Sequence, residues 1–256
     1  TAKGMHLTPE GEEFMQYAKQ VLKMLGEMES LYKGGNQKKR HFSISGPRAS
    51  YIAEAFAEFS KVIGPEETEL FYKETNSKRT IQNILEHDYR LGILRYAAPY
   101  DVYFKNTLEE KKLQYELVTE FTYQLVMSRE SPLAALKEIT FDDLANYMEV
   151  AHADPYVPSL PLSTVVKEEL PDNITRRIYV FERASQFELL SRNPETFLWA
   201  SPIPHNLLER YDLVQRPCAQ NQRLYRDLLI YRKDYTLTTL DRQFIDMLSR
   251  IKKKYL

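Results

Sequence analysis

Polar groups suited to binding an anion follow the first two predicted strands. The stretch "SGPRAS" (45–50) offers the hydroxyls of Ser45 and Ser50, the guanidinium of Arg48 and the free amides of a helix N-terminus. The stretch "ETNS" (74–77) ends the second strand in the same way, with Thr75, Asn76 and Ser77. A helix N-terminus beside an arginine favours a carboxylate or a similar anion.

Similar groups stand at element ends in the second half of the chain. Arg183 and Ser185 begin a predicted helix, and Ser201-Pro202 end a predicted strand. For each of these groups an ordinary helix cap is the alternative interpretation. If the topology brings them to one cleft, their convergence predicts a binding site for a small molecule.

The residues that catalysis or metal binding would need are scattered. The sequence has no serine-nucleophile, Walker or dinucleotide motif and no H-E-x-x-H pair. His152 with Asp154 is too small a set for a metal site, and a hydrogen bond at a cleft rim explains it better. Cys218 has no evident histidine base, which predicts a structural thiol. We therefore expect no enzyme, no metal and no cofactor.

Composition is that of an ordinary globular protein. The chain has 256 residues, 43% of them apolar and 28% charged, with a formal net charge of −1. No apolar run is long enough to span a membrane, and no secretory leader is recognisable. The single cysteine excludes an internal disulfide and fits a cytoplasmic protein. The basic run 38–40 is either a phosphate contact or, as we prefer, a solvated linker.

The front of the chain predicts a long helix that needs a partner. Thr8 can cap it, Pro9 suits its first position, and Gly34-Gly35 end it. Its apolar residues follow a heptad seam, which is narrower than the stripe of a helix that lies on its own domain. The interpretation is a dimerising helix rather than a docked one, with these seam residues: Phe14, Ala18, Val21, Leu25, Met28 and Tyr32.

From residue 41 onward, predicted strands and helices alternate, which indicates βαβ units and a parallel sheet. The predicted strands are 41–46, 68–75, 89–95, two extended segments in 113–128, 148–154, 175–182 and 196–202. The predicted helices are 50–63, 77–86, 141–147, 163–170, 183–192 and 238–255. We divide the chain into a linker (1–35), subdomain I (39–120 with 235–256) and subdomain II (121–234). A cleft between two such units is a common ligand site.

The chain resembles the LysR-type transcriptional regulators. The most specific match is "AKGMHLTPEGEEFMQYAKQVL", which is similar to the junction of wing and linker helix in that family. Suggestive matches are "FSISGPRAS", "TIQNILEHDYRLGILR" and "SPLAALKEITFDDLANY". His87, where the family commonly has Gly, and the bulky Trp199 depart from the pattern.

The resemblance implies an α/β fold of two Rossmann-like subdomains of the type 2 periplasmic-binding-protein kind, behind a linker helix. It implies a bacterial, cytoplasmic homodimer or homotetramer that binds promoter DNA through a winged helix-turn-helix head, which this sequence lacks. A small-molecule effector, for which the arginines favour an anion, would shift the oligomer geometry. The family's effector positions fall on Ser45, Gly46 and Arg48, on Thr75, Asn76 and Ser77, and on Ser201 and Pro202.

Two other classes share a bilobal scaffold. A solute-binding protein of a transporter would need a leader or lipid anchor and has no use for a heptad helix. An enzyme would need clustered ionisable groups at the cleft. Deleting residues 1–35 distinguishes the regulator from these two classes, because only the regulator is expected to lose self-association.

Overall fold

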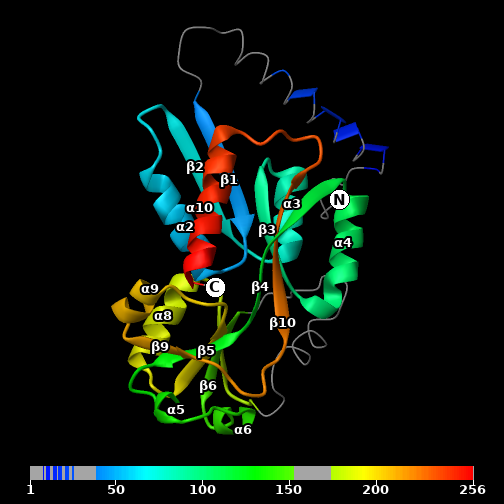
Figure 1. The fold of residues 1–256 in the computed structure, drawn as a ribbon. Coiled ribbons are helices and arrows are strands. Elements are labelled where there is room, and N and C mark those ends of the chain that lie inside the picture. Colours follow the sequence, from blue (N-terminus) through cyan, green and yellow to red (C-terminus); the bar gives the residue numbers. More distant parts are fainter. Residues whose placement is uncertain are drawn as a thin grey trace, which may run out of the picture. The chain divides into compact units, whose positions relative to one another are not determined.

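The computed structural model describes residues 8, 10, 11, 14, 15, 17, 18, 21, 22, 25, 39–152 and 174–255 (Figure 1). Backbone contacts divide the chain into a small unit, Thr1–His41 with Pro65–Glu69, and a large unit, Phe42–Gly64 with Leu70–Leu256. Among the described helices, none is both long and apolar enough to cross a membrane.

The first sheet is mixed. Its strand order is β2 (Thr68–Glu74), β1 (Arg40–Gly46), β3 (Leu91–Ala97), β10 (Leu224–Arg232) and β4 (Leu113–Thr122). β1 and β3 run parallel, as the strand–helix alternation predicted, but β10 runs antiparallel to both β3 and β4. The chain thus returns to this sheet at Leu224, whereas the sequence-based division kept 121–234 together as subdomain II.

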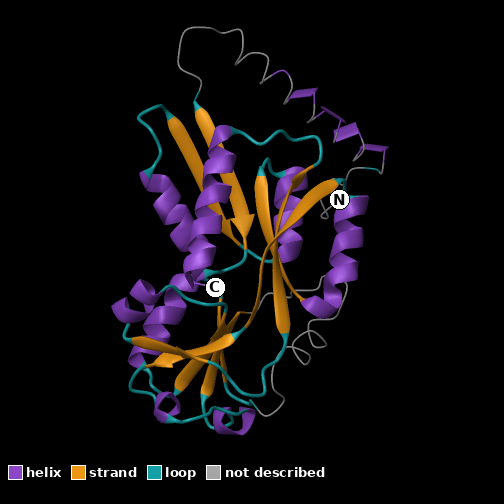
Figure 2. Ribbon diagram, in the orientation of Figure 1, coloured by secondary structure: helices purple, strands orange, loops and turns teal. Residues whose placement is uncertain are grey.

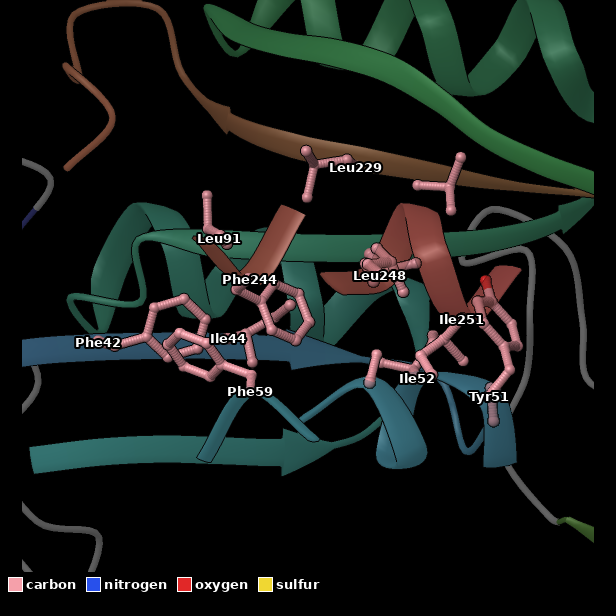
Figure 3. Packing of buried hydrophobic residues seen from close by; sticks show 14 of the residues in the cluster. Phe42, Ile44, Tyr51, Ile52, Phe59, Leu91, Leu229, Phe244, Leu248 and Ile251 are labelled. Atoms are coloured by element: carbon pink, nitrogen blue, oxygen red, sulfur yellow. The ribbon is translucent and has the colours of Figure 1, made fainter. Parts of the chain in front are cut away.

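Helices lie on both faces of this sheet, as Figure 2 shows. They are α2 (Ser50–Lys61), α3 (Ser77–Glu86), α4 (Asp101–Glu110) behind the 3-10 turn η1 (Ala98–Tyr100), and α10 (Thr239–Tyr255). α2 and α10 pack side by side over one apolar core, which Figure 3 shows around Phe42, Phe59 and Phe244. α3 and α4 cover the opposite face.

β3 illustrates why the sheet needs both layers. All of its residues are buried, and alternate side chains of a strand point to opposite faces. Leu91 and Ile93 enter the core under α2 and α10, while Leu94 and Tyr96 enter the core under α3 and α4. By this alternation Arg95 belongs to the α2 face, where it interrupts an otherwise apolar stripe.

The second sheet is also mixed. Its strand order is β7 (Arg177–Val180), β6 (Met148–His152), β8 (Thr196–Ala200), β5 (Gln124–Ser128) and β9 (Leu213–Arg216). β6 runs parallel to β7 and β8, whereas β5 runs antiparallel to β8 and β9. Its helices are α5 (Pro132–Ala135), α6 (Phe141–Leu144), α8 (Arg183–Arg192) and α9 (His205–Arg210). Separate apolar clusters lie on the two faces of this sheet as well.

Most predicted elements are found within a few residues of their predicted bounds. Thr140 caps α6 as predicted, in a capping box with Asp143, although the helix is shorter than 141–147. The predicted helix 163–170 lies outside the described residues. The sequence analysis did not identify α4, α5, α9 or β9, and it gave no bounds for β10.

Two cations of the basic run 38–40, Lys39 and Arg40, pair with nearby acids, while residue 38 lies outside the described residues. Lys39 lies 2.6 Å from a carboxylate oxygen of Glu69, and Arg40 lies 2.8 Å from one of Glu66. All four residues belong to the small unit. This pairing favours the linker interpretation of these cations over a phosphate contact.

Candidate functional site

The first wall of the site is built where β1 and β2 end. The backbone amide of Thr75 donates to the carbonyl of Gly46 (2.7 Å), so the two strand ends are held together. α2 and α3 both begin at this edge. α2 follows Ala49, which provides no side-chain cap, and its first turn holds no acidic residue. Its N-terminal amides are therefore available to a ligand.

A pocket opens beside these helix ends. It encloses about 610 Å³, counting the part that is open to solvent. Its lining includes arginines, a histidine, hydroxyls and amides but no aspartate or glutamate. The lining residues are Pro47, Arg48, Ser50, Thr75, Asn76, Ser77, Arg95, Tyr123, His152, Gln186, Leu198, Trp199, Ala200 and Ser201. Such a surface attracts a negatively charged ligand.

Arg95 is the most firmly held polar group of the pocket. Its side chain is 3% exposed, and its Nε and Nη2 donate to the two carboxylate oxygens of Asp227 at 2.8 and 2.6 Å. Tyr51 donates a further hydrogen bond to Asp227 (2.5 Å), and Arg95 Nη1 donates to Ser201 Oγ (3.2 Å). A bidentate, additionally hydrogen-bonded pair of this kind fixes both orientation and charge.

Neighbouring groups hold Arg95 from its other sides. Its guanidinium carbon lies 4.6 Å from the ring centre of Phe121 and 5.9 Å from that of Tyr123. The Ser77 hydroxyl donates to the Arg95 carbonyl and accepts from its amide. Burial lowers the pKa of Arg95, but the charge of Asp227 more than compensates, so the pKa stays well above its ordinary value. Arg95 is therefore a permanent cation.

The second wall comes from the other sheet. His152 contacts the Val180 carbonyl through Nδ1 and Gln186 Oε1 through Nε2, both at 3.1 Å, so a hydrogen bond near the cleft explains this histidine. Asp154 lies outside the described residues. The Trp199 ring contacts Phe141 and Phe197, and its buried indole nitrogen has no hydrogen-bond partner within the described part of the chain.

Hydrogen bonds join the two sheets around this pocket. One of them is the bond from Arg95 to Ser201. Arg48 Nε donates to the Phe181 carbonyl (2.6 Å), and Arg183 Nε donates to Glu74 Oε1 (2.6 Å). Asn206 Nδ2 donates to Glu54 Oε1 (3.3 Å). Glu74 and Arg183 are both mostly buried. Of these bonds, only that of Arg95 to Ser201 joins two residues of the pocket lining, and each of the others includes at least one residue outside it.

The structure brings most of the predicted site residues together. Those that line the pocket are Arg48, Ser50, Thr75, Asn76, Ser77 and Ser201. The residues predicted for the site that do not line it are Ser45, Gly46, Arg183 and Pro202.

The residues outside the lining have other partners. The Ser45 hydroxyl accepts from Asn83 on α3 (2.8 Å) because it lies on the far face of β1. Gly46 contributes a carbonyl to the join between strand ends, and Arg183 is bound to Glu74. No contact of the Pro202 side chain explains its position. Asn76 caps α3 by accepting from the Arg79 amide, so the cap interpretation holds for this residue.

Sequence reasoning missed the groups that dominate the pocket. Arg95 lies inside an apolar strand, and its partner Asp227 lies far along the chain in another apolar strand, so no local spacing marks either one. Tyr123 and Gln186 gave no signal at all. Trp199 was noticed only as a bulky departure from a family pattern.

The described residues before Lys39 agree with a capped helix. The Gly11 amide donates to Thr8 Oγ1 (3.1 Å), and the described residues between Glu10 and Leu25 are helical. Along the predicted seam, Phe14, Val21 and Leu25 are 72%, 55% and 50% exposed. Ala18 is half-buried. The seam residues Met28 and Tyr32 lie outside the described residues.

Metal and thiol chemistry find no support in the described ranges. No group of three or more His, Cys, Asp or Glu residues there could hold a metal ion. Cys218 is buried, and burial raises the pKa of its thiol. A buried thiol with a raised pKa is a poor nucleophile, in line with a structural role.

Comparison with known proteins identifies the fold. No family model and no curated protein matches the sequence. The effector binding domain of QuiR, solved in complex with shikimate, is 19% identical, with a TM-score of 0.55, over 85% of this chain and 100% of that one.

Two further solved structures have a similar fold, and one of them is described as a LysR family regulator. The regulatory domain of MetR, a LysR family regulator from N. meningitidis, is 14% identical, with a TM-score of 0.55, over 84% of this chain and 95% of that one. A mutant of full-length BenM is 15% identical, with a TM-score of 0.55, over 99% of this chain and 82% of that one. The chain therefore has the two-subdomain, periplasmic-binding-protein-like α/β fold of the effector-binding domains of LysR-family regulators.

Proposed function

We propose that this chain is the dimerisation helix and effector-sensing domain of a LysR-type, DNA-binding transcriptional regulator of the bacterial cytoplasm. One observation carries the proposal: a pocket lined by Arg48, Arg95 and two helix N-termini, without a carboxylate, on a fold that QuiR uses with bound shikimate. Fold likeness alone would be an analogy. The pocket adds a chemical reason for ligand binding.

The proposed effector is a small anion. Arg48 is bound to the Phe181 carbonyl and Arg95 to Asp227, so both guanidinium groups are oriented before a ligand arrives. Preorganised donors lower the entropic cost of binding. The residues Ser50 and Thr75 are 5% and 6% exposed, and their hydroxyls supply neutral hydrogen bonds at the same wall.

The proposed output is a population shift and not a reaction. Side chains from both sheets form the pocket, and the hydrogen bond from Arg95 to Ser201 connects its walls. A ligand that changes this bond favours one arrangement of the subdomains over another. In an oligomer, such a change alters the spacing of the DNA-binding heads.

The proposed oligomer contact is the front helix, taken as residues 1–35, with a second copy of itself. Its exposed seam of Phe14, Val21 and Leu25 has the spacing of a coiled coil. The proposed sensor consists of subdomain I (39–120 with 235–256) and subdomain II (121–234), with β10 counted in the first sheet. The DNA-binding head would precede residue 1.

Sedimentation velocity tests the dimerisation part. Replacing Phe14, Val21 and Leu25 together by Ser should convert a dimer to a monomer, whereas replacing Met15 and Leu22, which are also exposed on this helix, should change the mass less. A mass that no variant changes would contradict the role of the seam.

The gene upstream of the Thr1 codon tests the class. A reading frame that encodes a compact basic helix-turn-helix supports the regulator. A secretory leader there would favour a solute-binding protein of a transporter, which is the alternative on this fold.

A further inference from the structure

The guanidinium of Arg95 has donors left over. An arginine side chain carries five N–H bonds. Arg95 uses three of them: Nε and Nη2 to Asp227, and Nη1 to Ser201. Five minus three leaves two N–H bonds that have no acceptor among the described residues. Both belong to Nη1 and Nη2, the nitrogens at the end of a side chain that lines the pocket.

The geometry decides which edge of the guanidinium a ligand can use. Asp227 occupies the side edge, formed by Nε and Nη2, with bonds of 2.8 and 2.6 Å. At the end edge, Nη1 donates one bond, to Ser201 (3.2 Å), and Nη2 donates one, to Asp227, so each of these two nitrogens keeps one further N–H bond. The bond to Ser201 is the longest of the three and joins a neutral hydroxyl. A carboxylate makes two stronger, charge-assisted bonds to such an edge.

The contacts of the Arg95 guanidinium group hold it in one orientation. Asp227 is itself fully buried and accepts a further hydrogen bond from Tyr51. Phe121 lies against the guanidinium plane, with its ring centre 4.6 Å from the guanidinium carbon. Arg48 differs, because its side chain is more exposed and its Nε is bound to a main-chain carbonyl. Arg95 is the better-positioned receptor of the two.

We propose that Arg95 is the specificity-determining residue of the pocket and that it selects a small carboxylic acid by binding its carboxylate at the end edge, in place of Ser201. The proposal rests on the proposed function, since it names the effector class of that site. Asp227 and Tyr51 act as positioning residues. Ser50, at the first turn of α2, lies on the same lining and supplies a second hydrogen-bonding group.

The other lining residues indicate which chemical groups of the acid, apart from its carboxylate, the pocket can hold. Pro47, Leu198, Trp199 and Ala200 give it an apolar part, and Tyr123 adds an aromatic ring. Ligand sites of this kind combine an apolar surface with a few fixed polar groups. A compact acid with a hydrocarbon or ring body fits this chemistry better than a free inorganic anion.

Isothermal titration calorimetry on the full chain tests the proposal with a fixed probe set. The probes are formate, acetate, benzoate and shikimate, each compared with its primary amide, and inorganic phosphate. We expect at least one acid to bind at least tenfold more tightly than its amide. Arg95→Lys keeps the charge but loses the fork, and it should reduce this preference to less than threefold.

Arg226→Lys is the matched control. Arg226 is also an ion-paired arginine of the first sheet, on β10, but it binds Asp101 and Glu120 and does not line the pocket. It should keep the preference for the acid. An acid preference that survives Arg95→Lys, or a probe set in which no acid is preferred to its amide, would overturn the proposal. Tighter binding of phosphate than of any acid would also overturn it.

A second variant covers the case in which Arg95→Lys does not fold. Ser201→Ala removes only the hydroxyl that competes with the ligand for Nη1, so this variant should bind the acid a few-fold more tightly than the wild type does. A tenfold loss would assign the ligand to Ser201 instead. If an acid and its amide bind equally tightly, the inference about Arg95 is wrong but the proposed effector-sensing role is not contradicted. If the wild-type chain is a monomer in sedimentation, the proposed regulator function is contradicted but the inference about Arg95 is not.

Discussion

Among the described residues, each sheet has a buried carboxylate paired with an arginine on the neighbouring strand, and the two carboxylates differ in how many hydrogen bonds they accept. In the first sheet, Asp227 faces Arg95 across β10 and β3 and accepts two bonds from it and one from Tyr51. In the second sheet, Glu149 faces Arg177 across β6 and β7 and accepts one bond at 2.9 Å.

The difference shows in the protonation of each pair. Burial raises the pKa of Glu149 to about 7, because the single bond from Arg177 does not compensate for the lost hydration. In the first sheet, burial and the charge of Asp227 raise the pKa of Tyr51 well above its ordinary value, so Tyr51 stays a neutral donor. The comparison teaches that Arg95 at the pocket keeps its charge, whereas Glu149 away from the pocket can titrate.

Breaking the first pair should give the largest effect. Asp227→Ala leaves Arg95 buried without its counter-charge, which typically costs about 3–5 kcal/mol. Urea unfolding followed by circular dichroism measures the loss. If the free energy of unfolding falls by less than about 1 kcal/mol, water or another group solvates Arg95 in the variant. That result would contradict the claim that Asp227 is what balances the buried charge of Arg95.

Titrating the second pair should give a smaller, pH-dependent effect. The folded-state pKa of Glu149, about 7, lies above the ordinary glutamate value of 4.5. Its stabilising contribution is therefore complete below about pH 4.5 and is lost as the pH rises through about 7. At 1.36 kcal/mol per pKa unit, the loss is about 3 kcal/mol at most.

Urea unfolding at pH 5 and pH 8 measures this loss, with Glu149→Gln as the reference. The variant cannot ionise at this position, so its free energy of unfolding should change less between pH 5 and pH 8 than that of the wild type. Equal slopes for wild type and variant would show that Glu149 does not titrate in this range.

Removing the third bond to Asp227 should give the smallest of these effects. Tyr51→Phe keeps the ring in the core but deletes the hydroxyl that donates to Asp227. The expected cost is about 1.5 kcal/mol, the lower end for a hydrogen bond to a charged group. Tyr51 and the second arginine bond both distinguish Asp227 from Glu149, so a stability equal to that of the wild type would leave the arginine bonds as the only difference that matters.

The sequence predicted the elements whose patterns are local. Ser50–Lys61 and Ser77–Glu86 each follow a turn and carry an apolar stripe, so both helices were found close to their bounds. α9 is too short to show a period, and α4 has a weak one. The sequence did not predict that β10 returns antiparallel to β3 and β4, because the pattern of an apolar strand does not indicate the direction of its neighbours.

The candidate site divides in the same way. Arg48, Ser50 and Thr75 follow strands, so chain order alone placed them at one edge of the sheet. Arg95 and Asp227 meet only because β3 and β10 are neighbours, a pairing that follows from tertiary structure. Ser45 was misplaced because a single step along a strand turns the side chain to the opposite face.

The most direct test of the account is a crystal structure of the full chain with the acid that binds best in the calorimetric set. The account predicts both carboxylate oxygens within hydrogen-bond distance of Arg95 Nη1 and Nη2, with Ser201 Oγ displaced from Nη1 and the Asp227 bonds retained. A carboxylate bound elsewhere in the pocket, with the bond from Arg95 to Ser201 intact, would contradict it.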